Sequence, residues 1–232
     1  MNIIDKAQMF AAGAHAGVGQ KRKYTGEDYI TRPIAVAEIV RNNGGTDEMI
    51  AAAMLHDTIE DTQVTFGHIF SMFGDRVAEM VDALSNKAKP EDGNRETRFF
   101  INVRALRERL DMQSRVIKLA DLIHNTQSIT KYDQKFAAQY LAEKAFMLSV
   151  IFRGVEIGAS DEEIESRVGD HPLLVEAEKI VATALSRLPD ELFFKSDRIN
   201  AGLMEKWKSM EACTTTEDRR CGLFYSCLKQ IV

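Results

Sequence analysis

Apolar residues recur at helical spacing along residues 3–153, and no run alternates apolar and polar positions for long enough to predict a strand. The first amphipathic segment, residues 3–16, places Ile3, Ala7 and Phe10 on one side and charged residues on the other. The same pattern, punctuated by glycine, proline and capping residues, predicts an all-α protein with further helices over residues 33–41, 49–55, 65–73, 75–84, 95–110, 116–125 and 134–153.

The pattern changes after residue 153, where no catalytic motif is found. We expect two parts, a domain over residues 1–153 and a helical C-terminal extension over residues 154–232. The extension is expected to pack on the first domain, to shape the rim of its site, or to form a contact in a possible homo-oligomer. Its helices are predicted by three start signatures, at residues 160–163, 170–172 and 188–190.

The run Met49–Leu55 has no polar face, which predicts a buried helix whose C-terminal end delivers His56, Asp57, Glu60 and Asp61 into the interior. Carboxylates packed closely at a helix C-terminus repel one another and the helix dipole, so they need a cation, a proton or several donors. An imidazole beside carboxylate oxygens suits a divalent metal such as Mn²⁺, Mg²⁺ or Zn²⁺. The alternative is a helix end whose acids simply face water.

A second acid, Asp121, lies among apolar neighbours in the segment from Val116 to Asn125, so its carboxylate needs a partner. Asp121 and Asn125 are four residues apart and share one helix face. The residues alone leave open whether Asp121 binds a metal or pairs with a structural arginine. A lone histidine at the end of the first helix, His15, is open in the same way between a hydrogen-bonding role and a ligand role.

Residues 17–26 contain three glycines and the cations Lys21, Arg22 and Lys23, which predicts a loop. Such a loop is either a solvated surface or an anion site, because glycine allows close backbone approach and arginine binds phosphate through two donors.

The chain of 232 residues has 45% hydrophobic content, enough for a sizeable core, and a formal net charge of -5. This charge argues against nucleic-acid binding through general basicity. No stretch predicts a membrane span or a signal peptide, so we expect a cytoplasmic protein. The cysteines Cys213, Cys221 and Cys227 include no CxxC pair, so we expect reduced thiols.

Taken together, the segments resemble the HD-domain phosphohydrolases, and within them the hydrolase domain of RelA/SpoT-type alarmone enzymes and their small stand-alone relatives. The resemblance covers roughly residues 3–152. HD alone is a weak signal, but the motifs in this order are a strong one. They are Ala14-His15 with Gly19-Gln20-Lys21-Arg22-Lys23, Gly26-Glu27-Asp28-Tyr29-Ile30-Thr31-Arg32-Pro33, His56-Asp57-Thr58-Ile59-Glu60-Asp61, Phe73-Gly74, and Lys118-Leu119-Ala120-Asp121-Leu122-Ile123-His124-Asn125.

This resemblance implies an all-helical HD-domain bundle with one divalent cation, Mn²⁺ or another, held by a histidine, the HD pair and a later aspartate. The last three ligands correspond to His56, Asp57 and Asp121. It further implies that Glu60 and Asp61 position and deprotonate the attacking water.

The resemblance also implies a small-molecule nucleotide substrate. Arg22 and Lys23 would contact the nucleotide and its phosphates, while Asn125 and Tyr140 would line the ribose and base region. The implied reaction removes pyrophosphate from the ribose 3′ position of (p)ppGpp and returns GDP or GTP. The same chemistry on another phosphorylated nucleotide is the alternative.

The sequence departs from the family at Arg32, where the family has a histidine. A guanidinium has no lone pair for a metal and stays protonated, so Arg32 cannot be a ligand. Three outcomes are open: Arg32 points away and water or His15 completes the shell, metal binds weakly but sufficiently, or Arg32 replaces the metal as a phosphate clamp. The last outcome would give a metal-depleted nucleotide-binding pseudoenzyme, whereas the retained acids at Glu60, Asp61 and Asp121 favour an active site.

Overall fold

The computed structural model describes residues 1–153 and 171–212, which form helices and no strand, in agreement with the all-α prediction. An isolated antiparallel bridge joins Lys21 and Asp28 within the loop before the second helix. The helices are α1 (Ile3–Gly17), α2 (Thr31–Asn42), α3 (Asp47–Leu55), α4 (Thr58–Asp61), α5 (Phe66–Phe73), α6 (Asp75–Leu84), the 3₁₀ turn η1 (Pro90–Asp92), α7 (Arg95–Arg109), α8 (Met112–Tyr132), α9 (Gln134–Met147), the π-helical segment η2 (Leu148–Phe152), α11 (Pro172–Ser186) and α12 (Asp190–Ala212).

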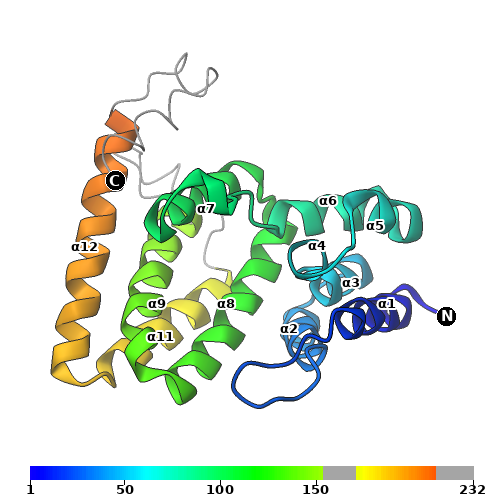
Figure 1. The fold of residues 1–232 in the computed structure, drawn as a ribbon, viewed down its shortest axis with the longest axis horizontal. Helices are drawn as coiled ribbons and strands as arrows, with labels where there is room; N and C mark the ends of the chain where they lie inside the picture. Colours follow the sequence, from blue (N-terminus) through cyan, green and yellow to red (C-terminus); the bar gives the residue numbers. More distant parts are fainter. Residues whose placement is uncertain (154–170, 213–232) are drawn as a thin grey trace.

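Helix α3 lies at the centre of the N-terminal half, with α1, α2 and α6 packed around it (Figure 1). All seven residues from Met49 to Leu55 are buried, which confirms the prediction for this run. Ala7 and Ala11 of α1 are fully buried, and their small side chains let α1 approach α3 closely. Helix α3 and its neighbours therefore form a densely packed apolar core directly before His56 and Asp57.

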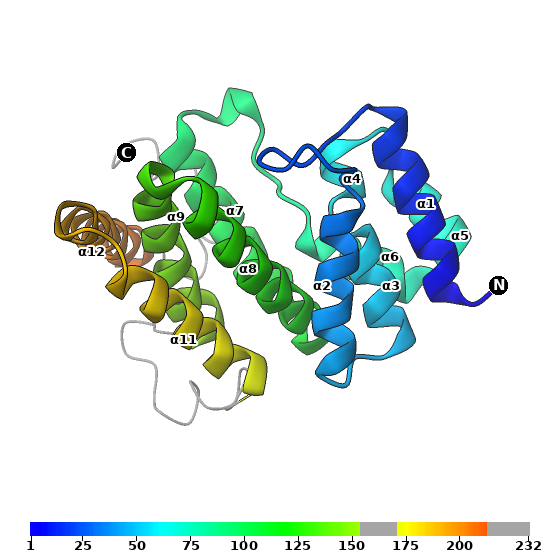
Figure 2. The ribbon, with the colours of Figure 1, turned by 90° about the horizontal axis from the view of Figure 1, so that it is seen from below.

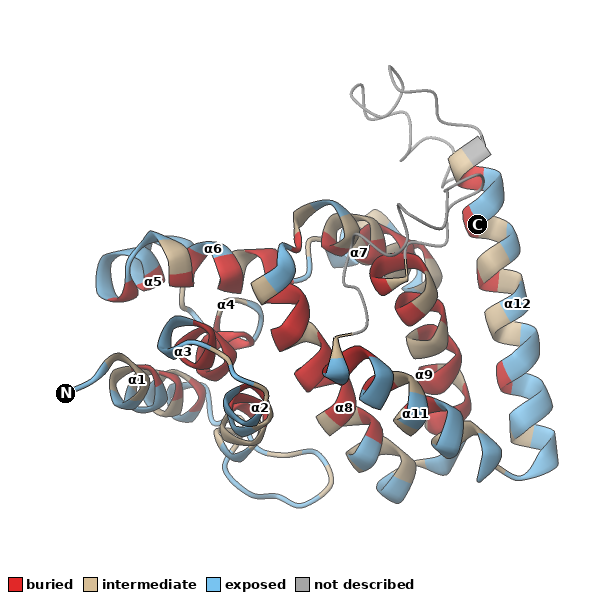
Figure 3. Ribbon diagram, turned by 180° about the vertical axis from the view of Figure 1, so that it is seen from behind, coloured by how far each residue is buried: buried red, intermediate tan, exposed pale blue. Residues whose placement is uncertain are grey.

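The long helix α8 joins the two halves of the molecule. It packs against α2, α3 and α6 on one side and against α9 and α11 on the other (Figure 2). Buried positions follow α3, α8 and α9 through the interior, whereas α12 exposes most of its surface (Figure 3). Because Asp121 lies midway along α8, this helix carries the acid to the junction with α2 and α3.

The helices that follow residue 170 pack on helices of residues 1–153. Helix α12 contacts α9, and α11 contacts both α8 and α9. Trp207 of α12 is buried, with its ring 6.2 Å from Phe100 and 5.8 Å from Phe146 between ring centroids. These aromatic contacts stabilise the packing of α12 against α7 and α9.

Helix boundaries differ from prediction in two places that bear on function. The chain turns at His56 and Asp57, so the acids Glu60 and Asp61 belong to a separate short helix, α4, and are exposed and not interior. The helix predicted to reach Arg153 changes to a wider π-helical turn over Leu148–Phe152. The predicted start signature at residues 160–163 and the three cysteines lie outside the described residues.

In the part of the chain that the structure describes, no helix has the length and apolar composition needed to cross a membrane.

Candidate active site

The turn after α3 places a histidine and an acid side by side in the interior. His56 and Asp57 have 4% and 9% of their surface exposed. The Nδ1 atom of His56 lies 2.7 Å from the carbonyl oxygen of Ala53, and Thr58 Oγ1 donates to the carbonyl of Leu55 at 2.7 Å. A hydrogen bond at Nδ1 fixes the ring, so Nε2 faces the acids. Nε2 lies 3.1 Å from Asp57 Oδ2 and 3.6 Å from Asp121 Oδ1.

Arg32, the residue that departs from the family, points into this site. Its Nη1 contacts Asp57 Oδ2, and its Nη2 donates to Asp121 Oδ1 at 2.5 Å. Its Nε donates to Asn125 Oδ1 at 3.1 Å. The structure therefore rules out the alternative in which Arg32 points away, and it shows that Asp121 has a structural arginine partner.

The neighbours of Arg32 complete a closed polar network. Tyr29 donates its hydroxyl to Asp57 Oδ2 at 2.8 Å, and Asn125 donates through Nδ2 to Asp121 Oδ1 at 2.8 Å. Lys118 Nζ lies 3.6 Å from Asp121 Oδ2. Hydrogen bonds that converge on a buried carboxylate favour its charged form.

The charges of the cluster balance among its own residues. Burial opposes the charged forms, but Asp57 and Asp121 outweigh it and raise the pKa of His56 to about 10. Burial likewise opposes ionisation of Asp57 and Asp121, yet the cations His56 and Arg32 hold the pKa of both carboxyls below its usual range. Two carboxylates thus face a guanidinium and an imidazolium within one buried cluster.

The donor set fits a divalent cation by its chemistry once His56 gives up its proton, because Nε2 then offers a lone pair beside the carboxylate oxygens of Asp57 and Asp121. Arg32 nevertheless binds the same two oxygens that face His56 Nε2. Within residues 1–153 and 171–212, no group of three or more His, Cys, Asp or Glu side chains is arranged to hold a metal ion. Metal ligation by these three residues therefore stays a prediction. His15 instead hydrogen-bonds Gln20, and its ring is tilted by 45° against that of Tyr29, with 4.6 Å between the ring centroids.

The acids of α4, Glu60 and Asp61, lie at the surface and are called the rim acids below. The backbone N–H and the side-chain amide of Asn86 donate to the two carboxylate oxygens of Glu60, both at 2.7 Å. Gln20 Nε2 donates to Asp61 Oδ2 at 2.9 Å. Desolvation raises the pKa of Glu60 against the opposing effects of Lys118 and Asn86. Both acids are held in place by these hydrogen bonds and keep part of their surface exposed to water.

The glycine-containing loop folds back over α8. Gly26, with φ of 74°, closes a turn in which its N–H donates to the carbonyl of Arg22 at 2.9 Å. Arg22 Nη2 then donates to Ser128 Oγ on α8 at 3.2 Å. Lys23 lies at the surface, 3.5 Å from Asp133. The loop thus brings Arg22 beside the face of α8 that carries Asn125, whereas Lys23 lies further out.

A sequence model described as an HD domain matches residues 7–148, which is more than half of the chain. The chain belongs to the HD-domain family. Phosphohydrolases of this family generally depend on a divalent metal.

Relatives of this HD domain include named alarmone enzymes. The chain is 36% identical over 129 residues to a probable guanosine-3′,5′-bis(diphosphate) 3′-pyrophosphohydrolase of Synechocystis, covering 55% of this chain and 17% of that protein. It is 38% identical over 123 residues to the guanosine-3′,5′-bis(diphosphate) 3′-pyrophosphohydrolase of Haemophilus influenzae, covering 52% and 18%. A probable GTP diphosphokinase of rice is 26% identical over 212 residues, covering 88% and 29%. The chain thus spans less than a third of the length of these relatives.

Solved structures share the fold. A metazoan ortholog of SpoT, described as hydrolysing ppGpp, superposes with a TM-score of 0.51 at 19% identity, covering 86% of this chain and 94% of that one. A crystal structure of a Listeria monocytogenes protein gives a TM-score of 0.51 at 24% identity, covering 69% and 99%. These similarities show that the helices of the HD domain are arranged alike.

The structure brings most predicted site residues together and adds others. Asn125 belongs to the Arg32 network, whereas Tyr140 is buried on α9, and burial raises the pKa of its hydroxyl. Sequence reasoning did not assign a role to Tyr29 or to Asn86. Tyr29 belongs to the family motif over residues 26–33 and could have been found there, but Asn86 follows the end of α6 without any motif.

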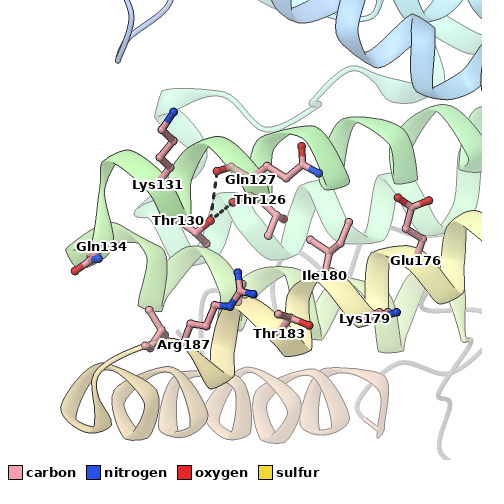
Figure 4. A pocket seen from close by; sticks show the side chains of 12 residues that line it. Thr126, Gln127, Thr130, Lys131, Gln134, Glu176, Lys179, Ile180, Thr183 and Arg187 are labelled. Carbon is pink, nitrogen blue, oxygen red and sulfur yellow. Dashed lines mark hydrogen bonds between the residues drawn. The ribbon is translucent and has the colours of Figure 1, made fainter.

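A separate groove of about 730 Å³ lies between α8 and α11 (Figure 4). Its walls carry the cations Lys131, Lys179 and Arg187 and the acid Glu176. Thr130 Oγ1 donates to the backbone carbonyl of Thr126 at 2.7 Å there. None of the predicted site residues lines this groove, so the acidic cluster and the groove are different features of the HD-domain chain.

Proposed function

We propose that this HD domain hydrolyses the 3′-diphosphate of guanosine alarmones of the (p)ppGpp type. The observation that carries the proposal is the convergence of His56, Asp57 and Asp121 in one buried cluster, with Glu60 and Asp61 on the short helix that follows His56 and Asp57. The names of relatives at 36% and 38% identity support the same chemistry. The substrate is a small nucleotide, and we place the activity in the cytoplasm.

Each part of the site has a role in this proposal. Arg22 contacts the phosphates from the folded loop and Lys23 extends the positive charge outward, while Asn125 and Tyr140 border the ribose and base. Glu60 and Asp61 position a water molecule and take its proton. The water oxygen attacks the phosphorus bound to O3′, the bond from that phosphorus to O3′ breaks, and O3′ leaves with a proton as pyrophosphate is released.

A divalent cation, with Mn²⁺ as the first candidate, is the cofactor that we propose for His56, Asp57 and Asp121. When bound there, it would supply a Lewis acid and an activated water. Because Arg32 contacts two of the three ligands, such an ion has to compete with a guanidinium for the same oxygens.

A second candidate function is nucleotide binding without turnover. The observation that favours it is the Arg32 bridge, which neutralises Asp57 and Asp121 with a residue of the chain itself. In this case the site would recognise phosphates through Arg22 and Lys23 and would lack the hydrolytic step.

Release of pyrophosphate from ppGpp by the purified chain, with chelator and across a Mn²⁺ series, tests the proposal. A panel should include pppGpp and nucleotides with a 3′-phosphate on another base. Metal-dependent release from ppGpp supports the first function, and release only from other nucleotides changes the substrate. Tight ppGpp binding without release at any metal concentration supports the second function.

A further inference from the structure

Arg32 has the contacts of a resident cation. Its side chain is 11% exposed, and its two Nη atoms reach carboxylates on different elements, Asp57 after α3 and Asp121 on α8. Its third donor, Nε, is taken by Asn125. A guanidinium whose three nitrogens all meet acceptors, two of them on buried carboxylates, is strongly held, because breaking the arrangement leaves buried charges without partners.

The oxygens that Arg32 occupies are the ones a metal ion would need. Asp57 Oδ2 and Asp121 Oδ1 are the two carboxylate atoms nearest to His56 Nε2, at 3.1 Å and 3.6 Å. The same two atoms accept the Nη1 and Nη2 contacts. A divalent cation bound to both oxygens would lie against the guanidinium, whose positive charge repels it, so binding of the ion requires Arg32 to leave these oxygens.

We propose that Arg32 takes the place of a divalent cation in this site. The guanidinium then links Asp57 to Asp121 without a metal, and the site binds metal only weakly unless Arg32 is substituted. The inference concerns the site in the absence of nucleotide and does not rest on the proposed hydrolysis. It also predicts that any metal-supported reaction of the unaltered chain needs a high metal concentration.

The test measures Mn²⁺ binding by the chelator-treated full chain, using the electron paramagnetic resonance signal of free Mn²⁺. Arg32→His removes the guanidinium and restores an imidazole. Arg41→His is the matched control, because Arg41 lies on the same helix and pairs with exposed Glu38. We expect Arg32→His to bind one equivalent at least about 100-fold more tightly than the unaltered chain and the control. Adding Asp121→Asn to Arg32→His should abolish that site.

Thermal melting gives a second readout. The unaltered chain should melt at the same temperature in chelator and in Mn²⁺, whereas Arg32→His should melt lower in chelator and recover with Mn²⁺. If Arg32→His fails to fold, the unaltered chain still tests the inference. The inference then requires that micromolar Mn²⁺ leaves the melting temperature of the chain unchanged and that the chain does not reduce the resonance signal of free Mn²⁺.

Two results would overturn the inference. One is a tight, single Mn²⁺ site in the unaltered chain that Asp121→Asn removes. The other is a folded Arg32→His variant that binds Mn²⁺ no better than the unaltered chain. Since nucleotide is absent, these results are independent of pyrophosphate release. A chain that hydrolyses ppGpp with tightly bound Mn²⁺ would refute this inference and leave the proposed function intact.

Discussion

The inner cluster and the outer rim of the site differ in how their charges are held. Arg32, His56, Asp57 and Asp121 are buried or nearly so, and each lies within 4 Å of an opposite charge on another element. Glu60 and Asp61, in contrast, are exposed and rest on the neutral amides of Asn86 and Gln20. The inner cluster therefore links α2, the α3–α4 turn and α8, whereas the rim can change without breaking a contact between helices.

Asp121→Asn should have the largest effect, on stability. The change removes one of the two buried carboxylates that pair with Arg32 and the carboxylate that faces Lys118. Loss of this buried ion pair costs about 3–5 kcal/mol in the free energy of unfolding. Urea unfolding followed by circular dichroism measures it. Asp28→Asn is the control, because Asp28 pairs with Lys21 at the surface and should matter by about 1 kcal/mol or less. A loss at position 121 as small as that of the control would mean that the buried ion pair does not form in solution.

The inner cluster shows which parts of the site could be predicted from the sequence. Burial of Met49–Leu55 and of Asp121 followed from apolar runs, and both are confirmed. The direction of Arg32 was not readable, because it depends on how α2 packs against α8, and Arg32 and Asp121 are 89 positions apart. A motif fixes which residue types come near each other, whereas the choice between a metal and a guanidinium depends on side-chain placement in three dimensions.

The rim was less predictable than the interior. The sequence placed Glu60 and Asp61 at the end of a continuous buried helix, but the turn at His56 and Asp57 starts a new helix and brings both acids to the surface. Helical periodicity continues across such a turn, so hydrophobic spacing does not reveal it. The π-helical turn after α9 was missed for the same reason. The catalytic roles of the two acids stay predictions.

Glu60→Gln should separate activity from stability. If Glu60 takes the proton of water, the amide lowers pyrophosphate release from ppGpp about 100-fold or more. The free energy of unfolding should change by about 1 kcal/mol or less, because the side chain is exposed and the amide oxygen still accepts from Asn86. Glu79→Gln, an exposed change on α6, is the control.

The pH profile sharpens this test. Desolvation raises the pKa of Glu60, and a general base works only when deprotonated. Activity should therefore fall as pH decreases through a value above the ordinary range of glutamate, and Glu60→Gln should remove that acid limb. An unchanged rate and profile in the variant would assign the proton transfer to another group.

Arg22→Gln should have the smallest of these effects, on nucleotide affinity. Arg22 is half-buried on the folded loop and donates to Ser128, so the guanidinium lies over α8 without joining the inner ion pairs. Loss of one charged phosphate contact should weaken ppGpp binding about tenfold, measured by isothermal titration calorimetry with chelator present. Binding of GDP should weaken less if Arg22 contacts the 3′-diphosphate. Arg41→Gln controls for the loss of one positive charge elsewhere. If the affinities for ppGpp and GDP fall equally, Arg22 contacts the 5′ side of the nucleotide. If neither affinity falls, the loop that carries Arg22 does not take part in nucleotide binding.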